Sequence, residues 1–296
     1  MLPFKLKNKR PRRRVALIGL DGVSYDQIID LSNNGYLPNI TKLMEDGSLF
    51  RMKSSSPSIS PVSWTSCITG VNPATHGMFG YMDRRRESYG IYFPNALQIV
   101  SPQIWDYVTA ANKTTVAVNV PQTYPAKEIN GVLISGFVSL DFKKAVFPQQ
   151  ICSALEQIDY RIDVDFNEHS DDRTIMYEAL LYMLKKRRET CNYFMDRVDW
   201  NLFVGVISGT GRINLYQGRL LERAPDLILE GVPGYELSSD IDKDCLLGKS
   251  RYEGVPTSQD AFLCMKGLDA LKSKPHIIDL FPTILNILDV PFAAKN

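Results

Sequence analysis

The chain has 296 residues, of which 44% are hydrophobic and 23% are charged, and its formal net charge is +1. This length predicts one large or two modest globular domains, and the composition excludes a peptide, a coiled coil and a disordered chain. The sequence contains neither internal repeats nor low-complexity tracts. We therefore expect a compact body of the size of an enzyme.

The positive charge is concentrated at the N-terminus. Residues 1–14 contain seven Lys and Arg residues and no acid, which leaves 27 basic against 33 acidic residues in the rest of the chain. We interpret residues 1–14 as a basic tail and residues 15–296 as the folded domain. The tail could bind nucleic acid or an anionic membrane by electrostatic attraction. We favour a solvated tail that precedes the first strand.

Three features of the sequence bear on the cellular compartment. The longest stretch without a charged residue, 54–82, is too rich in Ser, Thr and Pro to span a membrane. The apolar run at 15–20 is too short for the core of a signal peptide. The five cysteines are widely spaced and include no CxxC pair, which favours reduced thiols over a disulfide framework or a zinc site. We expect a cytoplasmic protein.

Strand-like and helix-like segments alternate along the chain. The apolar run 15–20 ends in Asp21-Gly22, which is typical of a buried parallel strand followed by a tight turn and then a helix. Further strands are predicted at 48–52, 114–120, 132–135 and 201–207, helices at 37–44, 104–111, 148–158, 171–198 and 277–290, and short apolar runs at 227–229 and 262–265. This order predicts an α/β fold, a three-layer sandwich with a mostly parallel central sheet and helices on both faces.

Ligands of such sheets gather at the carboxyl ends of the strands. Asp21 lies at one predicted strand end, and residues 208–211 lie at another. An aspartate in this position can be a metal ligand or a general base. An Asp-Gly pair is also common in ordinary turns. Taken alone, Asp21 therefore favours a turn over a metal ligand or a general base.

The hydroxyl-rich loop 54–60 leads into Pro61, which predicts a helix with Ser60 as its N-cap and Pro61 as its first residue. A phosphate near Ser60 would meet both the hydroxyl group and the positive end of the helix dipole. By itself, however, this pattern favours a Ser60 that only caps the helix and binds no phosphate.

Five segments, in order along the chain, together indicate something more specific. They are VALIGLDGVSYDQI at 15–28, LPNITKLMEDGSLFRMKSSSPSISPVSWTSCITGVNPATHGMFGY at 37–81, IWDYVTAANKTTVAVNVPQTYP at 104–125, INLYQGRLLERAPDLILEGVPGYELS at 213–238 and IIDLFPTILNILDVP at 277–291. They resemble the type I phosphodiesterase and nucleotide pyrophosphatase branch of the alkaline phosphatase superfamily. The resemblance implies an alkaline-phosphatase-like sandwich.

The resemblance also implies a chemistry. Members of the family use two divalent metals, usually zinc or manganese, to bind a phosphoester and to activate a Ser or Thr that attacks phosphorus. Carried over to this sequence, the family pattern makes Ser60 the nucleophile, Asp21 the first metal ligand and Ser63 a contact of a phosphate oxygen. His76 matches a family histidine that we interpret as structural.

The other metal ligands of the family pattern are missing. Gly211 and Leu215 occupy the positions of an Asp-His pair, no Ser-Asp-His-Gly motif occurs, and the position of the last ligand histidine falls near Thr257. The chain has only three histidines, too few for a typical two-metal site. Carboxylates at 163–172 could substitute, and would suit magnesium or manganese, but we favour solvated charge. We therefore expect the domain at 15–296 to lack a long internal segment of the family near 211–216.

Two hypotheses remain, and the sequence leaves it uncertain whether the chain is an enzyme. In the first, the chain is a phosphodiesterase or phosphatase that acts on a small phosphoester, with Ser60, Ser63 and Asp21 in the roles above and with activity weakened or lost because most ligands are missing. In the second, it is a shortened, inactive relative that binds a phosphoester or a partner protein. The sequence predicts no oligomeric state.

Overall fold

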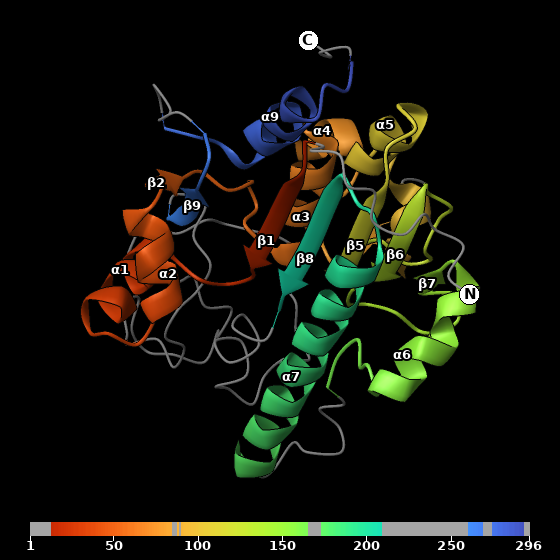
Figure 1. Ribbon diagram of the computed structural model, residues 1–296. Helices are drawn as coiled ribbons and strands as arrows, with labels where there is room; N and C mark the ends of the chain where they lie inside the picture. The colour runs from red at the N-terminus through yellow and green to blue at the C-terminus, as the bar shows by residue number, and fades with distance from the viewer. Residues whose placement is uncertain are drawn as a thin grey trace, which may run out of the picture. The chain divides into compact units, whose positions relative to one another are not determined.

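The computed structural model describes residues 13–84, 88, 90–164, 173–208, 260–268 and 274–292 (Figure 1). The chain forms two compact units, each built from segments that are distant in sequence. The first unit comprises residues 1–20, 60–207 and 278–296, and the second comprises residues 21–59 and 208–277. The apolar run predicted at 227–229 lies outside the described residues.

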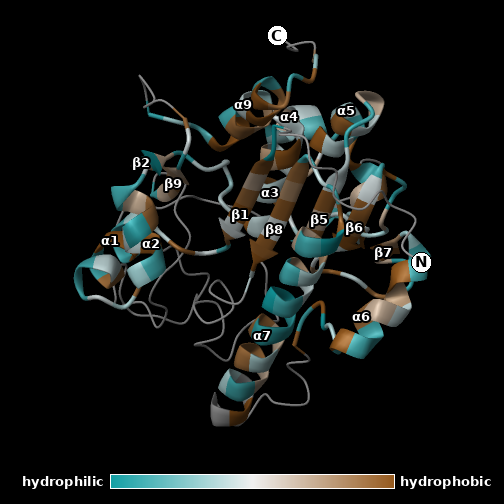
Figure 2. Ribbon diagram, in the orientation of Figure 1, coloured by the Kyte–Doolittle hydropathy of each residue, from teal (hydrophilic) through white to brown (hydrophobic). Residues whose placement is uncertain are grey.

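The first unit is built around a five-stranded sheet with the strand order β1-β8-β5-β6-β7. Strands β1, β8, β5 and β6 pair in parallel, and β7 is antiparallel to β6. The apolar composition of β5, β6 and β8, brown in Figure 2, is expected of strands covered on both faces, and these strands are buried. The prediction of a buried strand at 15–20 is wrong in its burial, because β1 lies at the edge of the sheet and Ile18 is 51% exposed. The bounds are β1 (Val15–Leu20), β5 (Thr115–Val120), β6 (Gly131–Ser135), β7 (Val146–Phe147) and β8 (Leu202–Ile207).

Helices cover both faces of this sheet, which confirms the predicted three layers (Figure 1). On one face, α6 (Cys152–Ile158) and α7 (Arg173–Arg197) form a common core with side chains of β5, β6 and β8. The other face carries α3 (Ser60–Thr69), α4 (Pro73–His76), α5 (Ile104–Ala110) and α9 (Leu280–Ile287). Phe281 of α9 meets Tyr107 of α5 edge to face, with ring centroids 5.4 Å apart. Among the described residues, no helix is both long and apolar enough to cross a bilayer.

The described residues of the second unit form two helices and a two-stranded antiparallel sheet. Its elements are α1 (Tyr25–Asn33), α2 (Pro38–Glu45), β2 (Ser48–Met52) and β9 (Ala261–Met265), with β2 paired to β9. A capping box starts α1, because Ser24 and Gln27 each accept from the other's backbone N–H. The strand predicted at 48–52 therefore pairs with the short apolar run at 262–265, in a sheet separate from the five-stranded one.

The sequence predicted the long elements and missed the short ones. The helix predicted at 148–158 is a 3-10 turn, η2 (Gln149–Ile151), followed by α6, and the one predicted at 277–290 is η3 (Ile277–Asp279) followed by α9. The strands β3 (Asp83–Arg84) and β4 (Ile91–Tyr92), the helix α4 and the turn η1 (Ala96–Gln98) were not predicted. Segments of two to four residues are too short to show a hydrophobic period.

Candidate active site

Helix α3 carries both hydroxyl residues that the family pattern selects, Ser60 and Ser63. The helix begins at Ser60, one residue earlier than predicted, and Pro61 occupies its second position. A proline is tolerated there because the N–H groups of the first turn have no partner inside the helix. The helix therefore starts one residue before the predicted position.

Ser60 and Ser63 are the accessible part of an otherwise buried helix. The eight other residues of α3 are buried, whereas these two serines are half-buried. Residues three apart lie on the same face of a helix, so the two hydroxyl groups share one face at the N-terminal end. The hydroxyl groups of Thr65 and Thr69 instead donate to the carbonyl oxygens of Pro61 and Thr65, each at 2.6 Å. Helix α3 thus presents two serines together with the positive end of its dipole.

A glycine in β1 lets α3 pack closely against the sheet. A Cβ atom at Gly19 would overlap the ring of Trp64, so the indole lies directly over the backbone of β1. Ser60 precedes Trp64 by one helical turn. This contact fixes the N-terminal half of α3 against the last residues of β1.

Asp21 lies in the turn that follows β1, as the sequence predicted. Gly22 has a φ of 76°, in the left-handed region that glycine enters without steric cost. Asp21 is the first residue of the second unit, whereas Ser60 and Ser63 belong to the first. The structure therefore brings the two serines together and places Asp21 in the other unit.

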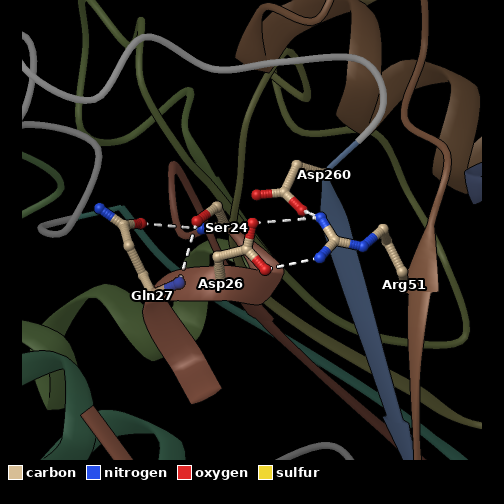
Figure 3. A network of polar contacts seen from close by, with 5 residues as sticks. All are labelled: Ser24, Asp26, Gln27, Arg51 and Asp260. Atoms are coloured by element: carbon tan, nitrogen blue, oxygen red, sulfur yellow. Dashed lines mark hydrogen bonds and ion pairs between the residues drawn. The ribbon is translucent and has the colours of Figure 1, made fainter. Parts of the chain in front are cut away.

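The segment after Asp21 is held by a network that the sequence did not predict (Figure 3). Arg51 of β2 forms ion pairs with Asp260 and, at 2.5 Å, with Asp26. Its guanidinium group lies 4.5 Å from the ring centroid of Tyr25, and the backbone N–H of Tyr25 donates to the carbonyl oxygen of Asp260 at 2.8 Å. These contacts join the start of α1 to β2 and to the start of β9. No local motif could have indicated them, because residues 51 and 260 are far apart in sequence.

A second unpredicted feature fixes the carboxyl end of β8 in the first unit. Asn119 of β5 has a φ of 61°, and its side-chain amide donates to the carbonyl oxygen of Val206 at 3.0 Å. Asparagine tolerates this left-handed conformation better than most residues. The regular β5–β8 ladder stops at Val118 and Gly205, so the amide continues the pairing by one further hydrogen bond. Buried Asn119 therefore stabilises the carboxyl ends of β5 and β8, and in such folds ligands bind at the carboxyl ends of the strands.

His76 is a structural residue, in agreement with its interpretation from the sequence. It is fully buried, and its Nδ1 accepts a hydrogen bond from the backbone N–H of Met78 at 3.1 Å. The proton must then reside on Nε2, which lies 2.9 Å from the hydroxyl oxygen of Ser66 and donates to it. Burial lowers the pKa of His76 to about 4. Because both ring nitrogens are used within the fold, His76 is not available as a metal ligand.

The described residues do not fit a two-metal centre. They contain no group of three or more His, Cys, Asp and Glu side chains placed to hold a metal ion. The positions of the missing family ligands, Gly211, Leu215 and Thr257, lie outside the described residues, as does His169. In the second unit, His276 forms an isolated backbone bridge with Lys53.

Comparison with known proteins agrees with this architecture. The profile of the family "Type I phosphodiesterase / nucleotide pyrophosphatase" matches residues 15–219. A phosphonoacetate hydrolase from Sinorhizobium meliloti, solved in complex with phosphonoacetate, has a similar fold, with a TM-score of 0.50 and 16% sequence identity. The alignment covers 71% of this chain and 50% of the hydrolase, so this chain corresponds to about half the length of that protein.

A more distant likeness is to murine ectonucleotide pyrophosphatase / phosphodiesterase 5, solved as an inactive variant in complex with AMP. Its TM-score is 0.45 at 11% identity, and the alignment covers 69% of this chain and 45% of that chain. Among curated protein sequences, none matches this chain.

Proposed function

Because the chain belongs to the type I phosphodiesterase / nucleotide pyrophosphatase family, we propose that it binds a small phosphoester at the N-terminus of α3 and hydrolyses it weakly. Ser60 is the nucleophile in this proposal, Ser63 contacts a phosphate oxygen, and Asp21 is the remaining metal ligand of the family pattern. The observation that carries the proposal is the exposure pattern of α3, in which these two serines alone are not buried.

The physical chemistry of α3 suits a phosphate group. The first N–H groups of a helix lack intrahelical partners and carry partial positive charge, so they attract an anion. A phosphoester held there would lie within reach of Ser60 Oγ, whose attack forms an O–P bond while the bond to the leaving alkoxide breaks and that oxygen takes up a proton. Water then hydrolyses the phosphoserine. Ser63, on the same helix face, can donate its hydroxyl hydrogen to a non-bridging oxygen.

Weak activity follows from the missing ligands. A bound divalent metal would lower the pKa of a coordinated hydroxyl group, but the described residues provide no set of donors for one. Without such activation, a serine hydroxyl is a poor nucleophile near pH 7. Zinc and manganese are the family's metals, and we infer that this chain binds them weakly or not at all.

The test is hydrolysis of nitrophenyl phosphate monoesters and diesters, with zinc or manganese added, by the natural protein and by Ser60→Ala. We expect a slow rate that Ser60→Ala abolishes. Ser139→Ala is a matched control, because the Ser139 hydroxyl donates to a carbonyl oxygen, that of Gly136 at 2.7 Å, in a loop of the same unit. Equal rates for all three proteins would refute the role of Ser60.

A second candidate function is favoured by the absence of a metal cluster among the described residues. In this candidate the chain is an inactive relative that binds a phosphoester, or a partner protein, without hydrolysis. Calorimetric titration with nitrophenyl phosphate distinguishes the two candidates: binding without turnover supports the second, and turnover lost with Ser60→Ala supports the first.

Two broader proposals accompany the function. We propose that the domain spanning 15–296 lacks a long internal segment near 211–216, which is supported by its coverage of only half of the phosphonoacetate hydrolase. We also propose a cytoplasmic location, because Cys67, Cys152, Cys191 and Cys264 are free thiols, as suits a reducing compartment.

A further inference from the structure

Exposed apolar side chains of the first unit are concentrated in residues 79–100 and in the loop that follows β6. Soluble monomers rarely expose large contiguous apolar patches, and such patches mark interaction sites. We name the exposed residues of these two segments the hairpin surface: Phe79, Tyr81, Met82, Ile91, Phe93, Leu97, Val100, Val138 and Leu140. Seven of these nine residues lie within one chain segment, 79–100.

The hairpin formed by β3 and β4 has the reverse of the usual alternation. Asp83 pairs with Tyr92 and Arg84 with Ile91, and successive side chains of a strand point to opposite faces. Ile91 and Phe93 are 63% and 72% exposed, whereas Asp83 and Tyr92 are half-buried. Burial also raises the pKa of Asp83. The hairpin therefore exposes its apolar residues and partly buries its acidic residue. This arrangement is unfavourable for a surface that contacts only water.

The loop after β6 extends the same surface. Phe137 of this loop meets Tyr81 edge to face, with ring centroids 6.2 Å apart. Three residues further on, Leu140 is 84% exposed. Lys143 and Lys144 follow it and are both exposed, and the Nζ atom of Lys144 lies 3.9 Å from the Asp141 carboxylate. Exposed apolar and basic side chains thus occur together in this loop.

We propose that the hairpin surface binds the interface of an anionic lipid bilayer. Exposed Phe, Leu and Ile side chains can enter the boundary between headgroups and acyl chains, while Lys and Arg attract anionic headgroups. The charge pattern agrees, because the exposed Lys143 and Lys144 follow the exposed Leu140 in the loop after β6. A protein partner fits less well, because lysine is depleted from protein–protein interfaces. This inference does not depend on hydrolysis by Ser60.

The test is flotation of the full chain with vesicles of phosphatidylcholine alone or of phosphatidylcholine and phosphatidylserine in equal parts. We expect binding to the anionic vesicles that weakens as salt is added. The double variant Ile91→Ser with Phe93→Ser should bind at least about tenfold more weakly, because each side chain that no longer enters the lipid loses apolar burial. Tyr36→Ser is the matched control, since Tyr36 is 73% exposed in the second unit, and its binding should equal that of the natural protein.

A second variant tests the charge. Lys143→Gln with Lys144→Gln should reduce both the affinity for anionic vesicles and its dependence on salt, whereas Lys185→Gln, an exposed position on α7, should change neither. Undiminished binding by the Ile91 and Phe93 double variant would overturn the proposal and assign binding to another part of the chain, such as residues 1–14. It would also be overturned if no vesicle bound and sedimentation showed a dimer that the double variant abolishes, because the occupant would then be a second copy.

Discussion

Ser60 and Ser63 share one face of α3, but their proposed roles predict different kinetic effects. Ser63→Ala removes one hydrogen bond to a charged phosphate oxygen, which costs about 1.5–3 kcal/mol. We therefore expect binding of nitrophenyl phosphate to weaken roughly tenfold or more, while Ser60→Ala eliminates turnover. Titration calorimetry and steady-state rates measure the two effects. An unchanged affinity in Ser63→Ala would remove this serine from the site.

His76 predicts a pH dependence of stability. Its folded-state pKa of about 4 lies below the ordinary value of 6.5, so between these values the unfolded state binds more protons. The free energy of unfolding should fall by at most about 3 kcal/mol as pH decreases from 6.5 to 4, with no further loss from this residue below that range. Urea unfolding of the natural protein and of His76→Gln measures the effect. The variant should show a shallower slope, and an identical slope would contradict the assignment.

At the level of elements, the contact between β1 and α3 depends on the missing side chain of Gly19. Gly19→Ala places a methyl group where the Trp64 ring lies, and such overpacking costs about 1–3 kcal/mol. Chemical denaturation checks this loss. Trp64→Leu should be less costly in the Gly19→Ala background than in the natural protein, because the smaller side chain relieves the overlap. If the two effects were simply additive, the contact would not be the cause.

The Arg51 network predicts an effect in the second unit. Arg51→Met removes the cation shared by Asp26 and Asp260 and should lower the free energy of unfolding by about 1 kcal/mol, a modest value because Arg51 and Asp26 are partly exposed. Lys53→Met, at an exposed position two residues away, is the control and should change stability by less than about 0.5 kcal/mol. A loss of equal size in both variants would show that the network contributes nothing specific.

At the scale of the whole molecule, the proposal that the chain binds zinc or manganese weakly or not at all predicts the outcome of thermal unfolding. A metal at one hundred times its Kd would stabilise the folded state by about 2.7 kcal/mol and raise the Tm by roughly 5 °C or more. We expect micromolar zinc or manganese to change the Tm by less than about 1 °C in thermal unfolding followed by circular dichroism. A larger rise would show that the chain completes a metal site with other residues.

The sequence by itself determined the main strands and long helices. Thr115–Val120 and Leu202–Ile207 are short apolar runs, and their continuous hydrophobicity reflects burial on both faces of a parallel sheet. Val15–Leu20 shows the same run but lies at the edge of the sheet, where Ile18 is exposed. The sequence also located the N-terminus of α3, because Pro61 after a hydroxyl-rich loop is a local signal. The family followed from several such segments in order, and the profile match confirms it.

Only the tertiary structure decided which residues of these elements meet. The pairing of β2 with β9, the amide of Asn119 on Val206, and Arg51 between two carboxylates each join residues far apart in the chain. Tertiary packing also decided which side chains are exposed. It leaves Ser60 and Ser63 accessible in a buried helix and exposes Ile91 and Phe93. Local patterns encode periodicity and turns, whereas exposure depends on what the rest of the chain packs against each element.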